Sequence, residues 1–217
     1  MGLDIMFYRI SKPRERKQDE SLNDYLWAIK KEQDKQFTKD TKAYIKNWLK
    51  DMKGFKETYQ SETISKIRSL YYEMKNKYFE YEFELDALDK AKTVKDVEAW
   101  FKGINWEWFH KPNAAYFRKV NSIYAYFADR LEDEMCVVTK SDIIDIIDIM
   151  NKATQVLSEH DEETSKGLLP TQGGFFFGST DYDDWYYHDM ITILEEFGKL
   201  LKDWTDDNDI VFVYMSW

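Results

Sequence analysis

Short apolar runs stand near both ends of the chain and once in its second half. Residues 1–10 (MGLDIMFYRI) have the composition of a β-strand, and the turn-forming pair Lys12-Pro13 follows them. Residues 210–217 (IVFVYMSW) have the same character, and the FFF run within 173–178 is bounded by glycines. Strands so far apart, separated by helical stretches, predict an α+β protein, mostly helical, whose small sheet gathers an N-terminal, a central and a C-terminal strand.

The apolar residues of 21–53 recur at spacings of three and four, which predicts one long amphipathic helix. Ser21 with Asp24 three residues later is an N-terminal capping signal, and Gly54 stands where a glycine commonly ends a helix. The mainly apolar side of this helix comprises Leu22, Leu26, Ile29, Phe37, Thr41, Tyr44, Trp48, Met52 and Phe55. The opposite side carries a lysine stripe, defined as Lys35, Lys39, Lys42, Lys46, Lys50 and Lys53.

A second helix is predicted over about 61–90, where apolar residues alternate at spacings of four and three, as in the seam of a coiled coil. A short turn at Gly54 joins the two helices, so we expect an antiparallel helical hairpin over about 21–90. This hairpin belongs to a helical elaboration over 11–110. We expect the elaboration to be inserted in a core made of 1–10 and 111–217, within a single domain spanning 1–217.

Three further helices are predicted in the C-terminal half, over 112–131, 139–158 and 183–202. Thr139 with Asp142 caps the second of them, and Asp183 opens the third. Residues 159–163 (EHDEE) are predicted to form a solvated loop.

The composition is that of an ordered protein, with 15 Tyr, 14 Phe and 8 Trp against 8 Gly and 3 Pro. Cys136 is the only cysteine, so no intrachain disulfide and no four-cysteine zinc site is available. No basic leader precedes an apolar run, and no 18 apolar residues stand together. We therefore expect a soluble protein of the reducing cytoplasm that does not enter a membrane.

The net charge of −10 is unevenly distributed along the chain. Residues 1–110 hold 22 Lys and Arg against 20 Asp and Glu, whereas residues 111–217 hold 9 against 21. The balance is +2 in the first segment and −12 in the second, so the acidity belongs to the C-terminal half.

Four short segments carry a resemblance to known proteins. They are MGLDIM at 1–6, YFRKVN at 116–121, LLPTQGGFFFGSTD at 168–181 and SW at 216–217. Together they resemble a family of uncharacterised phage and prophage proteins that open with MGLDMYL, carry the motifs YWRKAN and GFFFGS, and end in SSW. The resemblance covers the first ten residues and roughly 113–217, and leaves the helical segment between them outside.

The chain departs from that family at three places, with Phe117 in place of Trp, Val120 in place of Ala and Met215 in place of Ser. The resemblance implies a viral origin and the cytoplasm of a bacterial host cell. It brings no known reaction, so it supplies no catalytic residues.

The sequence offers little chemistry for catalysis. The histidines His110, His160 and His188 stand at unrelated points, and neither a Walker loop nor a GxGxxG motif is present. The best remaining case for an enzyme is a carboxylate cluster that would bind a divalent metal, formed by Asp181, Asp183, Asp184, His188 and Asp189. The alternative is that Asp183 and Asp184 stabilise a helix N-terminus without any metal.

A candidate binding pocket combines two segments of the C-terminal half. Arg118, Lys119 and Asn121 are flanked by Tyr116 and Tyr124, and they would face a second group formed by Ser179, Thr180, Asp181, Tyr182 and Trp185. Such a pocket would stack a base and neutralise a phosphate. The alternative is that the aromatic residues belong to the core and that Arg118 pairs with the Asp181–Asp184 cluster.

The lysine stripe has two interpretations. It is a solvated helix face, or it contacts an acidic partner or a nucleic-acid backbone. The acidic net charge and the absence of a recognisable reading motif argue against specific nucleic-acid binding.

These patterns favour a binding protein without cofactor over an enzyme. The first hypothesis is a phage accessory protein that binds and inhibits a host protein, such as a defence nuclease or a similar anti-phage component. The second is a sponge that sequesters a nucleotide signal in the Arg118 pocket. The third is a metal-dependent hydrolase that uses the Asp181 cluster.

Overall fold

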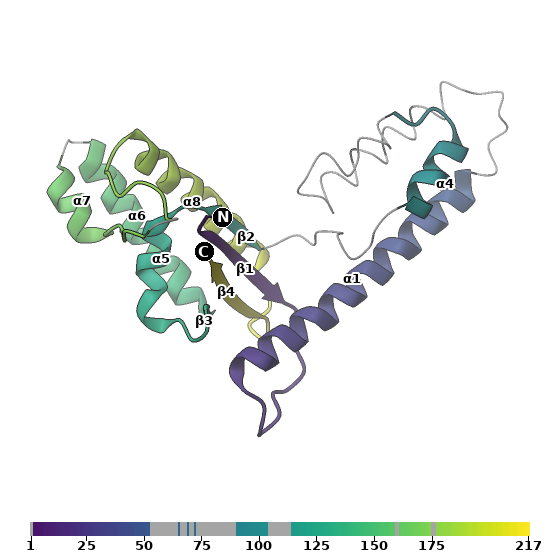
Figure 1. Cartoon of the computed structure of the whole chain (residues 1–217), viewed down its shortest axis with the longest axis horizontal. Coiled ribbons are helices and arrows are strands. Elements are labelled where there is room, and N and C mark those ends of the chain that lie inside the picture. The colour runs from purple at the N-terminus through teal and green to yellow at the C-terminus, as the bar shows by residue number, and fades with distance from the viewer. Residues whose placement is uncertain are drawn as a thin grey trace. The chain divides into compact units, whose positions relative to one another are not determined.

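The computed structural model describes residues 2–52, 65, 69, 72, 90–103, 114–158, 161–174 and 177–217 (Figure 1). The chain divides into two compact units. The first is made of Met1–Lys30 together with Asn113–Trp217, and the second of Lys31–Pro112. Residues 11–30 therefore group with the unit that holds the sheet, although the sequence assigned them to the inserted segment. The single-domain organisation stays a prediction.

The first unit contains one antiparallel sheet of four strands in the order β2-β1-β4-β3. Its strands are β1 (Asp4–Ile10), β2 (Ala115–Arg118), β3 (Met135–Val138) and β4 (Ile210–Ser216). Strands β1 and β4 pair along their full lengths, from Asp4 opposite Ser216 to Ile10 opposite Ile210, and lie at the centre of the sheet (Figure 1). The predicted α+β class, mostly helical with both terminal strands in one small sheet, is confirmed.

The two edge strands differ from the prediction. Residues 115–118 were assigned to a helix, but their exposure alternates along AYFR as a strand requires, with Ala115 and Phe117 buried. Lys119 then adopts a left-handed φ of 61°, which ends the strand and turns the chain into helix α5 (Asn121–Phe127) and a 3-10 turn (Ala128–Arg130). The predicted helix over 112–131 is therefore wrong in its first part.

The predicted central strand at 173–178 is also wrong in its described residues. Gly173, Gly174, Phe177 and Gly178 lie outside every strand, and the Phe177 amide donates to the Gly174 carbonyl in a turn. Gly178 has a φ of 93°, which an extended strand cannot contain. The sheet is completed instead by β3, whose four residues the sequence did not single out.

The remaining helices follow their capping signals. Helix α6 (Lys140–Ser158) begins after a reciprocal cap, in which Asp142 N donates to Thr139 Oγ1 and Thr139 N donates to Asp142 Oδ2. Helix α8 (Asp184–Asp203) is capped by Asp183 as predicted. The predicted loop at 159–163 is wrong at its end, because α7 (Glu162–Leu168) starts there behind a capping Asp161.

The main core lies between one face of the sheet and helices α5, α6 and α8. Three rings define its centre: Phe7 lies 5.1 Å and Phe117 5.3 Å from Phe197 of α8, centroid to centroid. Cys136 is buried in the same core, and its burial raises the pKa of the thiol to about 11. Cys136 therefore packs as a small apolar residue rather than a reactive thiol.

The other face of the sheet is covered by the start of helix α1 (Leu22–Met52), where Leu26 and Ile29 pack with Ile10 and Phe212. The predicted cap is present, because Asp24 N donates to Ser21 Oγ over 3.1 Å.

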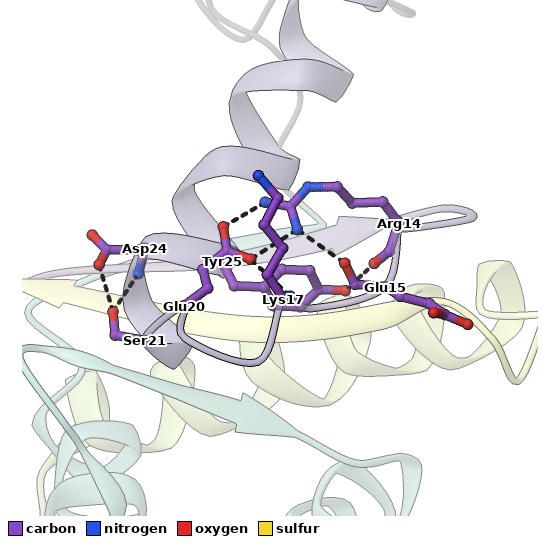
Figure 2. Close-up of polar contacts among 7 residues, drawn as sticks. All are labelled: Arg14, Glu15, Lys17, Glu20, Ser21, Asp24 and Tyr25. Atoms are coloured by element: carbon purple, nitrogen blue, oxygen red, sulfur yellow. Dashed lines mark hydrogen bonds and ion pairs between the residues drawn. The ribbon is translucent and has the colours of Figure 1, made fainter.

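The segment before α1 is tied down by a polar cluster (Figure 2). Arg14 binds both carboxylate oxygens of Glu20, at 2.5 and 2.8 Å, and the Tyr25 hydroxyl donates to the Arg14 carbonyl oxygen. The hydrogen bond from Arg14 lowers the pKa of Glu20 to about 2. These contacts fix the path of the chain between β1 and α1.

The second unit holds the rest of α1 and helix α4 (Val94–Gly103). Thr41, Ile45 and Leu49 are buried at a spacing of four, which places them on one side of α1. The predicted apolar side contained Thr41 but neither Ile45 nor Leu49, and its members Phe37, Tyr44 and Trp48 are only half-buried. The second half of the predicted hairpin and its turn at Gly54 lie outside the described residues, so the hairpin stays a prediction.

Candidate functional site

A pocket of about 370 Å³ opens in the first unit, where β2 ends and where α5 and α8 begin. Its walls include six residues that the sequence analysis selected as a pocket: Arg118, Lys119, Asn121, Ser179, Asp181 and Trp185. The other lining residues are Ser122, Gly178, Asp183, Tyr186 and Asp189. Two segments about 60 residues apart in the sequence thus meet at one site, as the candidate pocket required.

A close backbone approach shapes the pocket wall. Lys119 and Gly178 both have positive φ, at 61° and 93°. A Cβ atom on Gly178 would lie 3.2 Å from the Lys119 carbonyl oxygen, so only glycine fits at this point without strain. The Lys119 amide in turn donates to the Leu3 carbonyl oxygen over 2.7 Å, which anchors this turn to the start of the chain.

The loop that carries Ser179 and Asp181 is fastened on both sides. Asn121, which is only 4 % exposed, donates from Nδ2 to the Ser179 carbonyl oxygen over 2.5 Å. From the other side, the Thr171 hydroxyl donates to the Thr180 carbonyl oxygen, and the Thr171 amide donates to the Tyr182 hydroxyl. The pocket wall is therefore held by hydrogen bonds from two separate segments, around Asn121 and around Thr171.

Arg118 pairs with Asp4, and the proposed pairing with the Asp181–Asp184 cluster is not formed among the described residues. The Arg118 Nε lies 4.0 Å from Asp4 Oδ1, and the Tyr116 hydroxyl donates to the same oxygen over 2.6 Å. The Arg118 side chain is still 60 % exposed. Its guanidinium is thus available to a ligand at the pocket.

Two carboxylates of the pocket, Asp183 and Asp189, lie in different environments. Asp183 Oδ1 accepts hydrogen bonds from the amides of Trp185 and Tyr186, so it caps α8 as the helix interpretation expected. Asp189 is half-buried, and its burial, reinforced by the nearby Asp183 charge, raises its pKa to about 6 against a smaller opposing effect of His188. Asp189 thus titrates close to neutral pH.

The carboxylates do not converge as metal ligands. Among the described residues, no group of three or more His, Cys, Asp or Glu side chains is placed to hold a metal ion. The hydrolase hypothesis therefore finds no gathered ligand set in the described part of the chain.

Trp185 stands on the rim of the pocket with 76 % of its surface exposed. The hydroxyl of Tyr186, by contrast, is buried and donates to the Leu169 carbonyl oxygen. An indole left this exposed at the mouth of a pocket is a candidate contact for a ligand.

Four of the residues predicted for the pocket lie outside its lining. Tyr116 points to Asp4, and Tyr124 packs on Phe177 and Trp217 at 4.6 and 5.3 Å between ring centroids. Thr180 and Tyr182 support the loop through Thr171. The expectation that the aromatic residues belong to the core thus holds for Tyr124.

Two lining residues, Ser122 and Tyr186, were missed by the sequence analysis. Ser122 directly follows Asn121, the first residue of α5, and Tyr186 directly follows Trp185 in the first turn of α8. These positions are the only signal the sequence contains for them.

The lysine stripe belongs to the second unit. Lys35, Lys39, Lys46 and Lys50 are exposed and Lys42 is half-buried, while Lys53 lies outside the residues whose side chains are described. The stripe is thus accessible at Lys35, Lys39, Lys46 and Lys50, as both of its interpretations require.

No family model, no curated protein and no solved structure matches this chain. None of the described helices is both long and apolar enough to cross a bilayer. The function is therefore argued from the site itself.

Proposed function

We propose that the chain is a phage-type accessory protein that binds and inhibits a host protein without catalysis, and that the rim of the pocket forms the contact. The observation that carries this proposal is that two strongly exposed side chains line the same pocket. Trp185 is 76 % exposed and the Arg118 side chain is 60 % exposed. Tryptophan and arginine are enriched among the residues that dominate the energy of protein interfaces.

The charge of the pocket favours a protein over a nucleotide. Its lining carries two cations, Arg118 and Lys119, against the three carboxylates of Asp181, Asp183 and Asp189. A phosphate entering this space would meet more negative than positive charge, which opposes binding. A protein surface presents both signs of charge and can match such a mixed lining.

A nucleotide sponge remains the second candidate because the pocket combines adjacent cations with an exposed indole. Arg118 and Lys119 are adjacent, and an indole suited to stacking a base stands on the same rim. A ligand that binds only the folded state raises the melting temperature, so a nucleotide screen by thermal shift separates the two candidates.

The charge of the C-terminal half supports a host target of basic character in the bacterial cytoplasm. Residues 111–217 hold 9 Lys and Arg against 21 Asp and Glu. An acidic surface is complementary to the basic groove of a nucleic-acid-binding protein and speeds association with it. A defence nuclease fits this description.

The test is capture of host proteins from a bacterial lysate by the immobilised chain. The wild type is compared with Trp185→Ala and with a control that reverses Lys35, Lys39 and Lys46 of the lysine stripe to Glu. We expect the same host protein to bind to the wild type and to the stripe variant, and to be lost with Trp185→Ala. Equal capture by Trp185→Ala, or stabilisation by a nucleotide without any protein capture, would overturn the proposal.

A further inference from the structure

Trp185 and Asp189 lie one helical turn apart on α8, and both line the pocket. Residues four apart project from the same side of a helix, so the indole and the carboxylate face the same space. The indole stands at the rim with most of its surface exposed, whereas the carboxylate is half-buried. The pair therefore offers an aromatic surface at the entrance and a negative charge further inside.

The Asp189 carboxylate has no hydrogen bond or salt bridge within the described part of the chain. Its electrostatic neighbours are Asp183, which opposes its ionisation, and His188, which favours it. A partly desolvated carboxylate without a counter-charge is unfavourable for the folded protein, and groups of this kind gather at binding sites. A cation brought by a partner would supply the missing counter-charge.

Neither of the two cations that the described residues place in the pocket, Arg118 and Lys119, is paired with Asp189, so a third cation could be accommodated there. Arg118 is drawn towards Asp4, at 4.0 Å from its carboxylate, and Lys119 belongs to the exposed turn that follows β2. Asp189 enters the pocket from α8, together with Trp185 and the capping residue Asp183. The α8 side of the pocket is thus acidic and aromatic, while the β2 side is basic.

We infer that the pocket receives one basic side chain of the partner protein, an arginine or a lysine, held between the Trp185 indole and the Asp189 carboxylate. This inference rests on the proposed function and names the part of the partner that enters the site. A guanidinium or ammonium group over an indole gains cation–π attraction, and arginine adds stacking and paired hydrogen bonds to a carboxylate. Arg118 and Lys119 then face an acidic or carbonyl group beside that side chain.

The probe that tests this inference is N-acetyl-arginine amide, titrated into the full chain and followed by the indole N–H signal of Trp185 in NMR spectra. N-acetyl-citrulline amide, which has nearly the same shape without the charge, is the matched ligand control. We expect saturable binding of the arginine compound in the millimolar range, and affinity for the citrulline compound to be weaker by at least roughly tenfold.

Two variants localise the effect. Asp189→Asn keeps the shape of the side chain and is expected to weaken binding of the arginine compound by about tenfold. Asp184→Asn changes an exposed carboxylate of the same helix outside the pocket lining, and is expected to leave binding unchanged. Equal binding of the two compounds, the absence of saturable binding, or an Asp189→Asn variant that binds like the wild type would overturn the inference.

The titration needs no host protein, so its outcome is separate from that of the capture experiment. If capture depends on Trp185 while the arginine compound does not bind, the proposed function stands and the inference about the basic side chain is wrong. If the arginine compound binds while no host protein is captured, the proposed function is wrong.

Discussion

The side-chain amide of Asn121 donates a 2.5 Å hydrogen bond to the carbonyl oxygen of Ser179, 58 positions further along the chain. This bond connects the start of α5 to the loop before α8 and so joins the two segments that form the pocket. It is made by a side chain that is nearly fully buried, so the site is preorganised by the fold rather than assembled by flexible surface groups.

Removing this hydrogen bond should weaken both the fold and the site. Asn121→Ala removes this hydrogen bond, and the net contribution of such a bond to stability is typically about 0.5–1.5 kcal/mol. We expect the melting temperature to fall by several degrees, measured by calorimetry. Asn151→Ala, on the exposed side of α6, is the matched control and should have little effect. An Asn121→Ala protein as stable as the control would show that the bond does not hold the loop.

Two glycines of the same chain should respond in opposite directions to alanine. At Gly178 the φ of 93° and the 3.2 Å approach to Lys119 make a Cβ atom unfavourable, and we expect a loss of about 1–2 kcal/mol. At Gly198, inside α8, a Cβ atom would meet nothing within 4 Å, and alanine should stabilise the helix by about 0.5–1 kcal/mol. Denaturant unfolding measures both changes, and the same sign for the two would contradict the geometry.

Trp217 should contribute less to the free energy of unfolding than a fully buried tryptophan. It contacts Tyr124 and Phe177 at 5.3 and 5.8 Å between ring centroids, yet 45 % of its surface remains exposed. We expect Trp217→Ala to cost about 1–2 kcal/mol, below the 3–5 kcal/mol typical of a buried tryptophan. Urea unfolding gives this value, and an unchanged midpoint would mean that the ring contacts contribute nothing.

The raised pKa of Asp189 predicts a specific dependence of stability on pH. Its pKa of about 6 lies above that of a carboxyl in the unfolded chain, so the folded protein takes up this proton first as the pH falls. Ionised Asp189 therefore destabilises the folded protein at pH 7, and this destabilisation should disappear as the pH falls from 7 to about 4–5. The charged groups that line the pocket with it are Asp181, Asp183, Arg118 and Lys119, and His188 is its sequence neighbour.

Asp189→Asn tests this sign directly, because it removes the charge that the folded state disfavours. At pH 7 the variant should be more stable than the wild type by about 1 kcal/mol, a value discounted for partial exposure of the carboxylate. At pH 5 the difference should shrink. Asp184→Asn, at an exposed position in the first turn of α8, serves as the control. A variant that is less stable than the wild type at pH 7 would mean that Asp189 has a stabilising partner.

The elements that could be predicted from the sequence are those fixed by local signals. Helix caps at Ser21, Thr139 and Asp183 involve residues within a few positions of each other, so short motifs reveal them. Strand β2 was missed because its four residues become a strand only through pairing with β1, a contact from the other end of the chain. The FFF run was misleading because Phe177 is buried in a turn rather than in the sheet.

The candidate site could be predicted only in part from the sequence. Residues near 118–121 and 179–185 were selected by their chemistry, and the fold brings them together. Which of the aromatic side chains would point away, as Tyr124 does, depends on tertiary packing that no short motif records. The pairing of Arg118 with Asp4 likewise depends on the register of β1 against β2.

The most direct measurement of the central claim is competition for the captured host protein. The protein bound to the immobilised chain is challenged with N-acetyl-arginine amide and, in parallel, with N-acetyl-citrulline amide. If the partner inserts a basic side chain beside Trp185 and Asp189, the arginine compound releases it at concentrations that saturate the pocket, and the citrulline compound does not. A partner that stays bound in the presence of both compounds would contradict the account.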